Sequence, residues 1–376
     1  MRMQVRLLGG IAALGALIAL GAPATASASK ALGPNAFGIS AGGAIQGSAK
    51  LGRELETAER AGAEWLRVDI NWAQIQRRGR NSYDWEAIDR VVRGARARGM
   101  KVLGTIVYTP AWARPSGTGA TYGPDPAKYA LFARRAVRHY SAMGVHAYEV
   151  WNEPNISAFW TPAPNAVAYT RLLQAAYPAM KAADPSATVL TGGTAPALTD
   201  APSGGLLDWL DPSGGGTSVG PVEWLGQIYA NGGRGFFDGV AHHPYCWPAM
   251  PGQAEAWSAW YQMYGSDPSL RSLMVGNGDG AKKIWATEFG APTDGPDGTH
   301  VSESVQASMI ARAYGVWKDY GWGGPLFTYS GRDHGTNRSS NQNFFGLVRR
   351  DFSRKPSFRA YRTAAARAAT RRAARR

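Results

Sequence analysis

The feature that most constrains the fold is a repeated alternation of short apolar segments with amphipathic helical segments. The apolar segments, each followed by a helix or an irregular connection, lie at residues 37–40, 65–72, 101–110, 147–155, 187–195, 236–245, 282–293 and 324–333. Such alternation predicts a parallel sheet, and eight units favour a single α/β domain closed into a (β/α)8 TIM barrel. The alternative, an open doubly wound sheet, lacks support because no glycine-rich phosphate loop follows the first strand.

Residues 1–28 are predicted to stand apart from this barrel. A basic start, MRMQVR, precedes a short apolar run and a small-residue cleavage site, which is the pattern of a secretory signal peptide. The run is too short and too rich in glycine for a membrane anchor. We therefore expect a bacterial-type export signal, a secreted protein, a folded domain over residues 29–361 and a basic Ala/Arg-rich tail over residues 362–376.

The net charge of +14 raises the question of a nucleic-acid partner. Its densest part is the C-terminal stretch FRAYRTAAARAATRRAARR, which has seven arginines and no acidic residue. A nucleic-acid binder would instead present its charge on a folded face with aromatic residues between. The sequence therefore predicts no nucleic-acid partner, and at most a weak attachment of the tail to an anionic cell surface.

Several other kinds of site find little support. Cys246 is the only cysteine, so no intramolecular disulfide can form, and we interpret this residue as a packing residue. Residues 276–281 match a dinucleotide-binding pattern but lead into a strand instead of following one. Residues 216–220 match a nucleophile-elbow pattern with no strand before them. Without an H-E-x-x-H motif or a Cys/His cluster, the sequence predicts no metal and no cofactor.

Two glutamates occupy equivalent positions at the ends of the fourth and seventh predicted strands. Glu153 lies in YEVWNEPN and Glu288 in IWATEFGAP. Each follows an apolar strand and precedes a Gly or Pro turn, where a carboxylate is costly to bury unless it faces a cleft. Because sites in TIM barrels lie at the C-terminal ends of strands, we expect both carboxylates at one mouth of the barrel.

The two motifs, W-N-E-P and T-E-F-G in this order, resemble clan A of the glycoside hydrolases, and families 5 and 39 in particular. The resemblance spans residues 35–361. It implies a retaining O-glycosyl hydrolase for a β-linked poly- or oligosaccharide, with Glu288 as nucleophile and Glu153 as acid/base. The alternative is a carbohydrate-binding barrel without turnover. The sugar, internal or terminal cleavage and the oligomeric state stay open.

The resemblance also implies supporting roles. Asn152 would hydrogen-bond the sugar 2-hydroxyl, and Arg67 would keep the nucleophile ionised and oriented. An alternative for Arg67 is an ion pair with Asp69, which faces the same side of the strand. His243 and Tyr245 would face the site from the sixth strand, with the tyrosine hydroxyl bonded to the nucleophile.

Further candidates for sugar contacts follow strand ends, because sugar rings stack on aromatic planes. They are Trp72, Trp112, Trp160, Trp247 and Tyr329, together with Asp333 as a hydroxyl ligand. Each aromatic residue is equally compatible with core packing. Tyr329 stands where family 5 enzymes often have tryptophan, which disfavours a strict cellulase.

Overall fold

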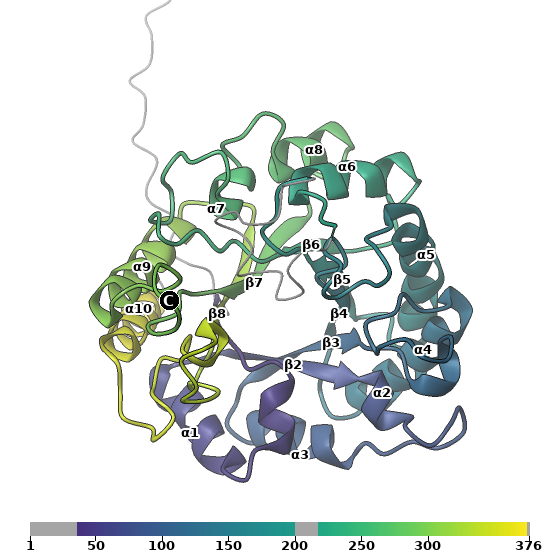
Figure 1. Ribbon diagram of the computed structural model, residues 1–376, viewed down its shortest axis with the longest axis horizontal. Helices are drawn as coiled ribbons and strands as arrows, with labels where there is room; N and C mark the ends of the chain where they lie inside the picture. Colours follow the sequence, from purple (N-terminus) through teal and green to yellow (C-terminus); the bar gives the residue numbers. More distant parts are fainter. Residues whose placement is uncertain (1–35, 200–216, 374–376) are drawn as a thin grey trace, which may run out of the picture.

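The computed structural model describes residues 36–199 and 217–373, which form a closed parallel barrel ringed by helices (Figure 1). Its strands are β1 (Phe37–Ser40), β2 (Trp65–Asn71), β3 (Lys101–Val107), β4 (Ala147–Asn152), β5 (Thr188–Gly193), β6 (Gly239–His242), β7 (Lys283–Phe289) and β8 (Gly323–Tyr329). Each strand pairs with its neighbour in sequence, and β8 pairs with β1. The predicted (β/α)8 barrel is confirmed. The predicted signal peptide lies outside the described residues.

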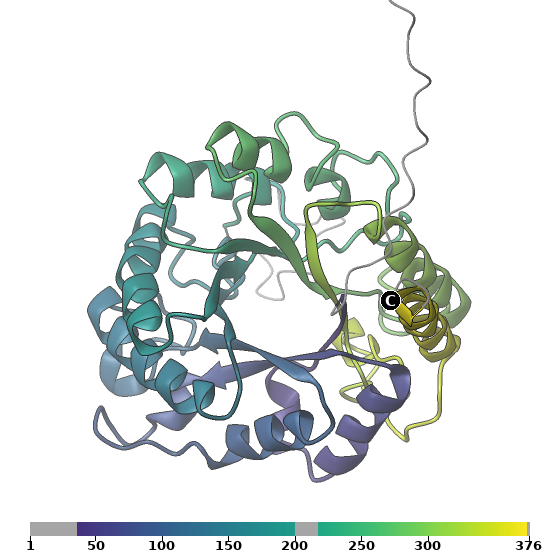
Figure 2. The same ribbon diagram turned by 180° about the vertical axis from the view of Figure 1, so that it is seen from behind.

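Helices cover the outside of the barrel, as the view from behind shows (Figure 2). The longer ones are α1 (Leu51–Ala61), α3 (Glu86–Arg96), α4 (Pro126–Ser141), α5 (Ala166–Ala183), α6 (Pro221–Ala230), α8 (Leu270–Gly276), α9 (Glu303–Trp317) and α10 (Pro356–Ala373). The short ones are α2 (Trp72–Ile75), α7 (Ala259–Gln262), η1 (Gly43–Gly47), η2 (Ala111–Ala113) and η3 (Asn341–Asn343). Within the described ranges, no helix combines the length and apolar character needed to cross a membrane.

Two of the longer helices, α4 and α5, begin at side-chain caps. The side chain of Asp125 accepts a hydrogen bond from the backbone of Lys128, with Pro126 at the first position of α4. Asn165 caps α5 in the same way. These side chains satisfy backbone N–H groups that have no partner within the helix, so local sequence determines where α4 and α5 begin.

The predicted start of the tail at residue 362 falls inside a helix. Helix α10 continues from Pro356 to Ala373 and packs against α9 and α1. Ala365 and Ala368 are buried, and the hydroxyl of Tyr361 donates to the carbonyl oxygen of Gly38. The alanines between the arginines thus form a packing face, so much of the basic segment belongs to the barrel. This corrects the predicted boundary.

The barrel interior consists of an apolar layer with a polar layer above it. The apolar layer is Trp65, Leu103, Ala147, Leu190, Ala241, Trp285 and Phe327. Two residues further along five of these strands come Arg67, Thr105, Glu149, His243 and Thr287, all of them buried. Because every second residue of a strand faces the same side, each strand carries an apolar side chain and then a polar one toward the C-terminal mouth.

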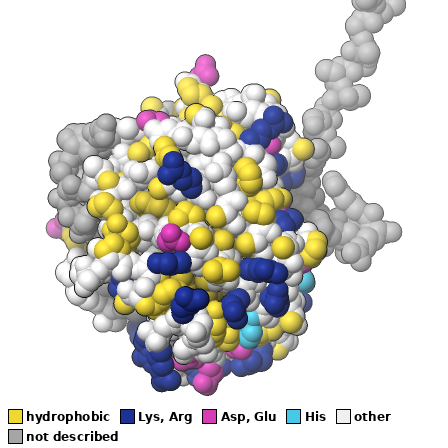
Figure 3. Space-filling model, turned by 90° about the vertical axis from the view of Figure 1, so that its right-hand side faces the viewer, with side chains coloured by type: hydrophobic (Ala, Val, Ile, Leu, Met, Phe, Trp, Pro, Cys, Tyr) yellow, Lys and Arg dark blue, Asp and Glu magenta, His cyan; other side chains and the backbone are white. Residues whose placement is uncertain are grey.

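Positive charge also covers a flank of the barrel. Figure 3 shows the side that carries α4 and α5, where Lys and Arg side chains are interspersed with apolar and a few acidic ones. Helix α4 exposes Lys128, Arg134, Arg135 and Arg138. The charge of the folded domain is therefore not confined to the C-terminal segment.

Replacing Phe327 by alanine should lower the free energy of unfolding by about 3–5 kcal/mol, because it opens a cavity in the apolar layer. The Phe327 ring is fully buried, meets Trp65 edge-on at 6.3 Å between ring centroids, and lies where a side chain at Gly38 would clash. Urea unfolding measures the change. Leu131→Ala, at a side chain 66% exposed, is the control and should shift stability by less than about 0.5 kcal/mol. Similar effects of the two substitutions would contradict the predicted layer.

Candidate active site

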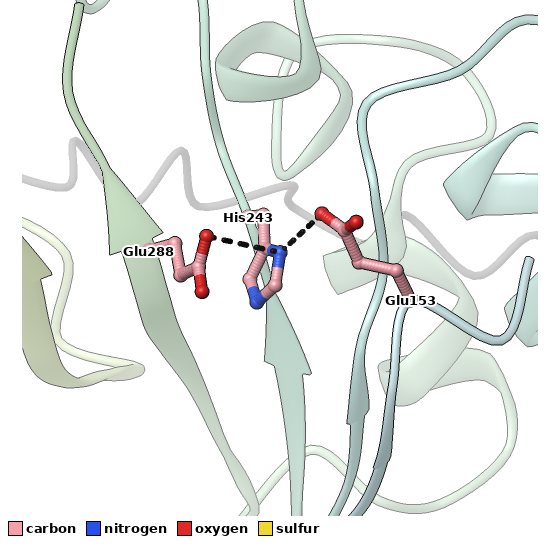
Figure 4. Close-up of side chains that lie close together, drawn as sticks. All are labelled: Glu153, His243 and Glu288. Atoms are coloured by element: carbon pink, nitrogen blue, oxygen red, sulfur yellow. Dashed lines mark hydrogen bonds and ion pairs between the residues drawn. The ribbon is translucent and has the colours of Figure 1, made fainter. Parts of the chain in front are cut away.

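Glu153 and Glu288 lie just beyond β4 and at the end of β7, on either side of His243, which follows β6 (Figure 4). The imidazole Nδ1 is 2.7 Å from Glu153 Oε1 and 3.9 Å from Glu288 Oε2. One oxygen of each glutamate and the imidazole nitrogen all lie within 4.8 Å of one another. The structure therefore brings together the two carboxylates that the strand positions placed at one mouth.

Backbone geometry at the end of β4 presents Glu153 to the mouth. Trp151 and Glu153 have φ angles of 76° and 45°, a left-handed conformation that costs a non-glycine residue about 1–3 kcal/mol. The backbone N–H of Glu153 donates to the carbonyl of Gly193 at 2.8 Å. The side chain of Asn155 bonds both backbone groups of Ala195. These bonds to β5 and its following loop hold the conformation.

The position of Glu288 is fixed where the main chain just after β7 lies against the end of β8. A β-carbon at Gly290 would lie 2.2 Å from the carbonyl oxygen of Tyr329, so only glycine fits there. The Glu288 carboxylate accepts a hydrogen bond from Arg67 Nη1 at 2.5 Å and one from the hydroxyl of Tyr245 at 2.8 Å. Both oxygens are thus bonded to donors suited to a carboxylate anion.

Arg67 donates hydrogen bonds to several side chains at the base of the site and is itself 1% exposed. Besides Glu288, its guanidinium donates to Glu149 Oε2 at 2.5 Å and to Asn152 Oδ1 at 2.7 Å. The predicted alternative partner, Asp69, makes no ion pair with it among the described residues. Burial lowers the pKa of Arg67, but the neighbouring carboxylates raise it more, so Arg67 stays charged.

Glu149 is a functional residue that the sequence analysis missed. It is fully buried and accepts hydrogen bonds from Arg67 and from Thr105 Oγ1, the latter at 2.6 Å. The sequence did contain a signal for this residue. A glutamate at an inward position of the apolar segment AYEVW needs a buried cation. Glu149 therefore balances the charge of Arg67 beneath the cleft.

Asn152 lies between the arginine and the cleft. Its Oδ1 is held by Arg67, and the residue lines the cleft beside Glu153. Because an amide has one accepting and one donating end, this contact orients the NH₂ group of Asn152 as the end available to a ligand.

The side chains of Glu153 and His243 lie beside each other at the mouth, and both are neutral near pH 7. Burial raises the pKa of Glu153 to about 8, with the positive charge of Arg67 opposing the shift and Glu149 adding to it. Burial likewise lowers the pKa of His243 to about 4, against the opposing effect of Glu288. Glu153 therefore carries a proton while Glu288 faces a cation and a hydroxyl donor.

A cleft of 280 Å³ lies over these groups. Its lining comprises Gly42, Gly43, Arg67, Asp69, Tyr108, Asn152, Glu153, Phe159, Tyr245, Glu288, Tyr329, Gln342 and Phe345. Of its rings, Tyr108, Phe159 and Tyr329 are partly exposed. Tyr329 was predicted to line the site, whereas Tyr108 and Phe159 were missed because they sit in loops whose direction the sequence does not reveal.

The four tryptophans predicted as sugar platforms do not line this cleft. Trp72, Trp160 and Trp247 are 0%, 3% and 2% exposed, so their rings are core residues. Trp112 is partly buried against Trp72 and donates to a backbone carbonyl. Trp72 also stacks on Phe132 of α4. The predicted roles are corrected because these side chains pack among neighbouring rings and helices instead of facing the mouth.

Asp333 is a structural residue and not a hydroxyl ligand at the cleft. It is 4% exposed and accepts hydrogen bonds from Lys355 Nζ at 2.7 Å and from the backbone of Gly346 at 2.8 Å. The buried ion pair ties the segment after β8 to the start of α10. Its carboxylate is therefore already satisfied within the fold.

Two other residues near the site also have structural surroundings. His242 points away from the cleft and bonds Thr194 Oγ1 and the carbonyl of Ala259, at 2.7 and 2.9 Å. Cys246 is buried, and burial raises the pKa of its thiol far above the usual value. The burial of Cys246 agrees with its interpretation from the sequence as a packing residue.

Among the described residues, the group Glu153, His243 and Glu288 is the one arrangement whose side-chain types could hold a metal ion. Glu288 is already engaged by Arg67 and Tyr245, and Glu153 shares a hydrogen bond with His243. The contacts within the protein fit a pair of acid and base carboxyls without a further ligand.

Replacing Glu153 by glutamine should stabilise the fold relative to the native protein as the pH rises. Below the unfolded pKa of 4.5 the buried carboxyl is protonated in both states, whereas between 4.5 and 8 only the unfolded chain loses the proton. This lowers native stability by up to about 1.4 kcal/mol per pH unit. Urea unfolding at pH 5 and pH 8 measures it, with Glu56→Gln, at a partly exposed surface residue of α1, as control. A constant difference between Glu153→Gln and native protein would contradict the shift.

Comparisons with known proteins agree with this site. The sequence profile of the family described as Cellulase (glycosyl hydrolase family 5) matches residues 34–271, a stretch that includes Glu153 and ends before Glu288. A search of curated proteins gave no significant match.

Similar solved structures include several glycoside hydrolases. A family 39 glycoside hydrolase from Bacteroides cellulosilyticus WH2 has 23% identity and a TM-score of 0.67, over 88% of this chain and 63% of that one. The GH39 enzyme from Xanthomonas axonopodis pv. citri has 20% identity and a TM-score of 0.66, over 88% and 66%. A GH39 β-xylosidase from Caulobacter crescentus has 20% identity and a TM-score of 0.62, over 90% and 73%.

The chain thus spans slightly less than two thirds of the length of the first two structures, and at these identities the likeness establishes the fold. The family profile covers more than half of the chain and contains the strand that ends in the W-N-E-P motif. This chain belongs to the cellulase family, glycosyl hydrolase family 5.

Proposed function

We propose that the protein is a secreted retaining glycosidase that cleaves a β-linked poly- or oligosaccharide by double displacement. The observation that carries the proposal is the pair of facing carboxyls, whose nearest oxygens lie within 4.8 Å of each other. Retaining glycosidases place their carboxyls about 5–5.5 Å apart, whereas inverting enzymes need about 6.5–9.5 Å to admit a water molecule. The spacing favours direct attack by one carboxylate.

In the first step, Glu288 attacks the anomeric carbon and the glycosidic C–O bond breaks. Glu153 donates its proton to the departing oxygen, so the leaving group departs as a neutral alcohol. Arg67 and Tyr245 hold Glu288 with both oxygens bonded. The raised pKa of Glu153 keeps its proton available near neutral pH.

In the second step, Glu153, now a carboxylate, takes a proton from water as that water attacks the anomeric carbon. The bond to Glu288 breaks, and the sugar leaves with its original configuration. Nδ1 of His243 is placed to hydrogen-bond Glu153 in either protonation state, because this nitrogen of the neutral ring donates in one tautomer and accepts in the other. The NH₂ end of Asn152 is placed to bond a sugar hydroxyl.

Family membership supports the substrate class. The family is named for cellulase, and one of the similar structures is a β-xylosidase, so β-glycans are the polymers to test first. The second candidate function is a carbohydrate-binding barrel without turnover. The complete set of bonded catalytic groups favours the enzyme.

We also propose that the protein is exported and that its C-terminal helix attaches weakly to an anionic lipid surface. Arg354, Arg359, Arg362 and Arg367 are exposed on or beside α10, and none forms an ion pair with another described residue. Unpaired basic side chains along one helix attract anionic surfaces through long-range electrostatics.

Glu153→Gln and Glu288→Gln should each lower the release of reducing ends from β-glucan, xylan or mannan by about 10²–10⁴-fold, because each removes a proton-transfer or nucleophilic group. NMR of the reaction catalysed by the native protein should show the β-anomer of the released sugar first, because double displacement retains the configuration. Azide should rescue Glu288→Ala with an α-glycosyl azide and Glu153→Ala with a β-glycosyl azide.

Glu56→Gln, at a partly exposed residue of α1 away from the cleft lining, is the matched control and should retain full activity. First formation of the α-anomer would contradict double displacement. Glycan binding with an inert native protein would favour the binding-protein candidate, and equal activity in all variants would place the chemistry on other residues.

Replacing Arg359, Arg362 and Arg367 together by glutamine should abolish sedimentation of the protein with phosphatidylglycerol vesicles. The attraction is electrostatic, so native binding should also disappear in high salt. Replacing Arg134, Arg135 and Arg138 of α4 removes the same charge elsewhere and is the control. Equal loss in both triple variants would contradict a specific role for α10.

A further inference from the structure

The cleft contains a third carboxylate that the proposed mechanism does not use. Asp69 is the next inward residue after Arg67 on β2 and lines the cleft with Glu153 and Glu288. It is 8% exposed, and its side chain makes no hydrogen bond or ion pair with any described residue. A carboxylate in this position carries a desolvation cost that the charge of Arg67 offsets only in part, because no described side chain donates a hydrogen bond to it.

The backbone beside Asp69 leaves room for a ligand. A β-carbon at Gly43 would lie 3.1 Å from Asp69 Oδ2, and Gly42 and Gly43 both line the cleft. Any larger residue at position 43 would crowd the carboxylate. Gly43 therefore leaves an oxygen of Asp69 uncovered on the side of the cleft.

Acidic side chains outnumber basic ones among the described residues that line the cleft. Arg67 is the one Lys or Arg among the described residues that line it, and its ion pairs go to Glu149 and Glu288. Arg67 acts on Asp69 through its charge without a hydrogen bond. A sugar carboxylate here would meet Asp69 and Glu288 with no Lys or Arg besides Arg67 among the described lining residues, whereas sugar hydroxyls would offer donors to Asp69.

We propose that Asp69 is a specificity-determining sugar-binding residue, which accepts hydrogen bonds from hydroxyls of the ring held between Glu153 and Glu288. The cleft then takes uncharged sugars and excludes uronates. This inference rests on the proposed function, because it presumes that a sugar occupies the cleft. It names the chemical class of that sugar.

The effect of replacing Asp69 on stability distinguishes a ligand-binding role from a structural one. A residue that stabilised the fold would lower the unfolding midpoint when it is replaced. Burial raises the pKa of Asp69 to about 6, with Arg67 opposing the shift and Glu288 adding to it. The stability associated with its proton is complete below pH 3.8 and is lost as the pH rises through 6. Replacing Asp69 by asparagine should therefore leave the unfolding midpoint at pH 8 unchanged or higher.

The test is calorimetric binding to the Glu153→Gln protein, which separates recognition from turnover. The probes are cellopentaose, xylopentaose and mannopentaose, together with β-1,4-linked pentamers of glucuronic and mannuronic acid. These uronate pentamers differ from the gluco and manno probes only at C6. At least one neutral pentamer should bind, and its uronate counterpart should bind at least tenfold more weakly.

Adding Asp69→Ala should weaken binding of that neutral pentamer by about tenfold or more, because a hydrogen bond to a charged group is lost. Asp69→Asn keeps one accepting oxygen, so its affinity for the pentamer should lie between that of the Asp69→Ala protein and that of the protein with Asp69 intact. Asp319→Asn, which removes a carboxylate from an exposed ion pair with Lys318, is the control and should have no effect.

Three results would overturn the inference: equal binding of uronate and neutral pentamers, unchanged binding after Asp69→Ala, or no binding of any neutral pentamer. A lowered unfolding midpoint for Asp69→Asn at pH 8 would assign the residue to the fold instead. Asp69-dependent binding by a protein that cleaves nothing would leave the inference standing and remove the proposed activity.

Discussion

The buried guanidinium of Arg67 holds the mouth of the barrel together. Through Glu149 and Asn152 it joins β2 to β4, and through Glu288 it joins β2 to β7 across the interior. An ion pair at this depth is stable only when its partners satisfy it, and removal of one partner leaves an uncompensated charge, at a cost of about 3–5 kcal/mol. The position of Glu288 therefore depends on a network that reaches below the cleft to the fully buried Glu149.

The same network makes two chemically identical side chains different. Glu288 is surrounded by a cation and a phenol donor, whereas Glu153 is buried beside a neutral imidazole and carries a raised pKa. Separation of two carboxyls into an anion and an acid is the condition for double displacement near neutral pH. In this barrel the different surroundings of Glu153 and Glu288 arise from the strands that carry them, β4 and β7.

The tryptophans show where sequence reasoning was wrong and why. The expectation that aromatic residues after strand ends line the mouth held for Tyr329 but not for Trp72, Trp160 or Trp247. A side chain just beyond a strand can turn inward to the mouth or outward to the helices, and its sequence position is the same in both cases. Glu149 was missed for a related reason, since its partner Arg67 lies 82 residues away.

The sequence by itself determined the order of strands and helices, the closed barrel and the presence of Glu153 and Glu288 at one end of it. These follow from local periodicity, from caps such as Asp125, and from the rule that all strands of a parallel barrel end at the same mouth. Only the tertiary structure decided that Arg67 forms its ion pair with Glu149 and not with Asp69, and that Asp333 belongs to a buried ion pair. It also decided that Asp69 lines the cleft with no hydrogen-bond partner for its side chain among the described residues. Those contacts join residues far apart in the chain, and their selection depends on strand register and loop direction, which no local pattern encodes.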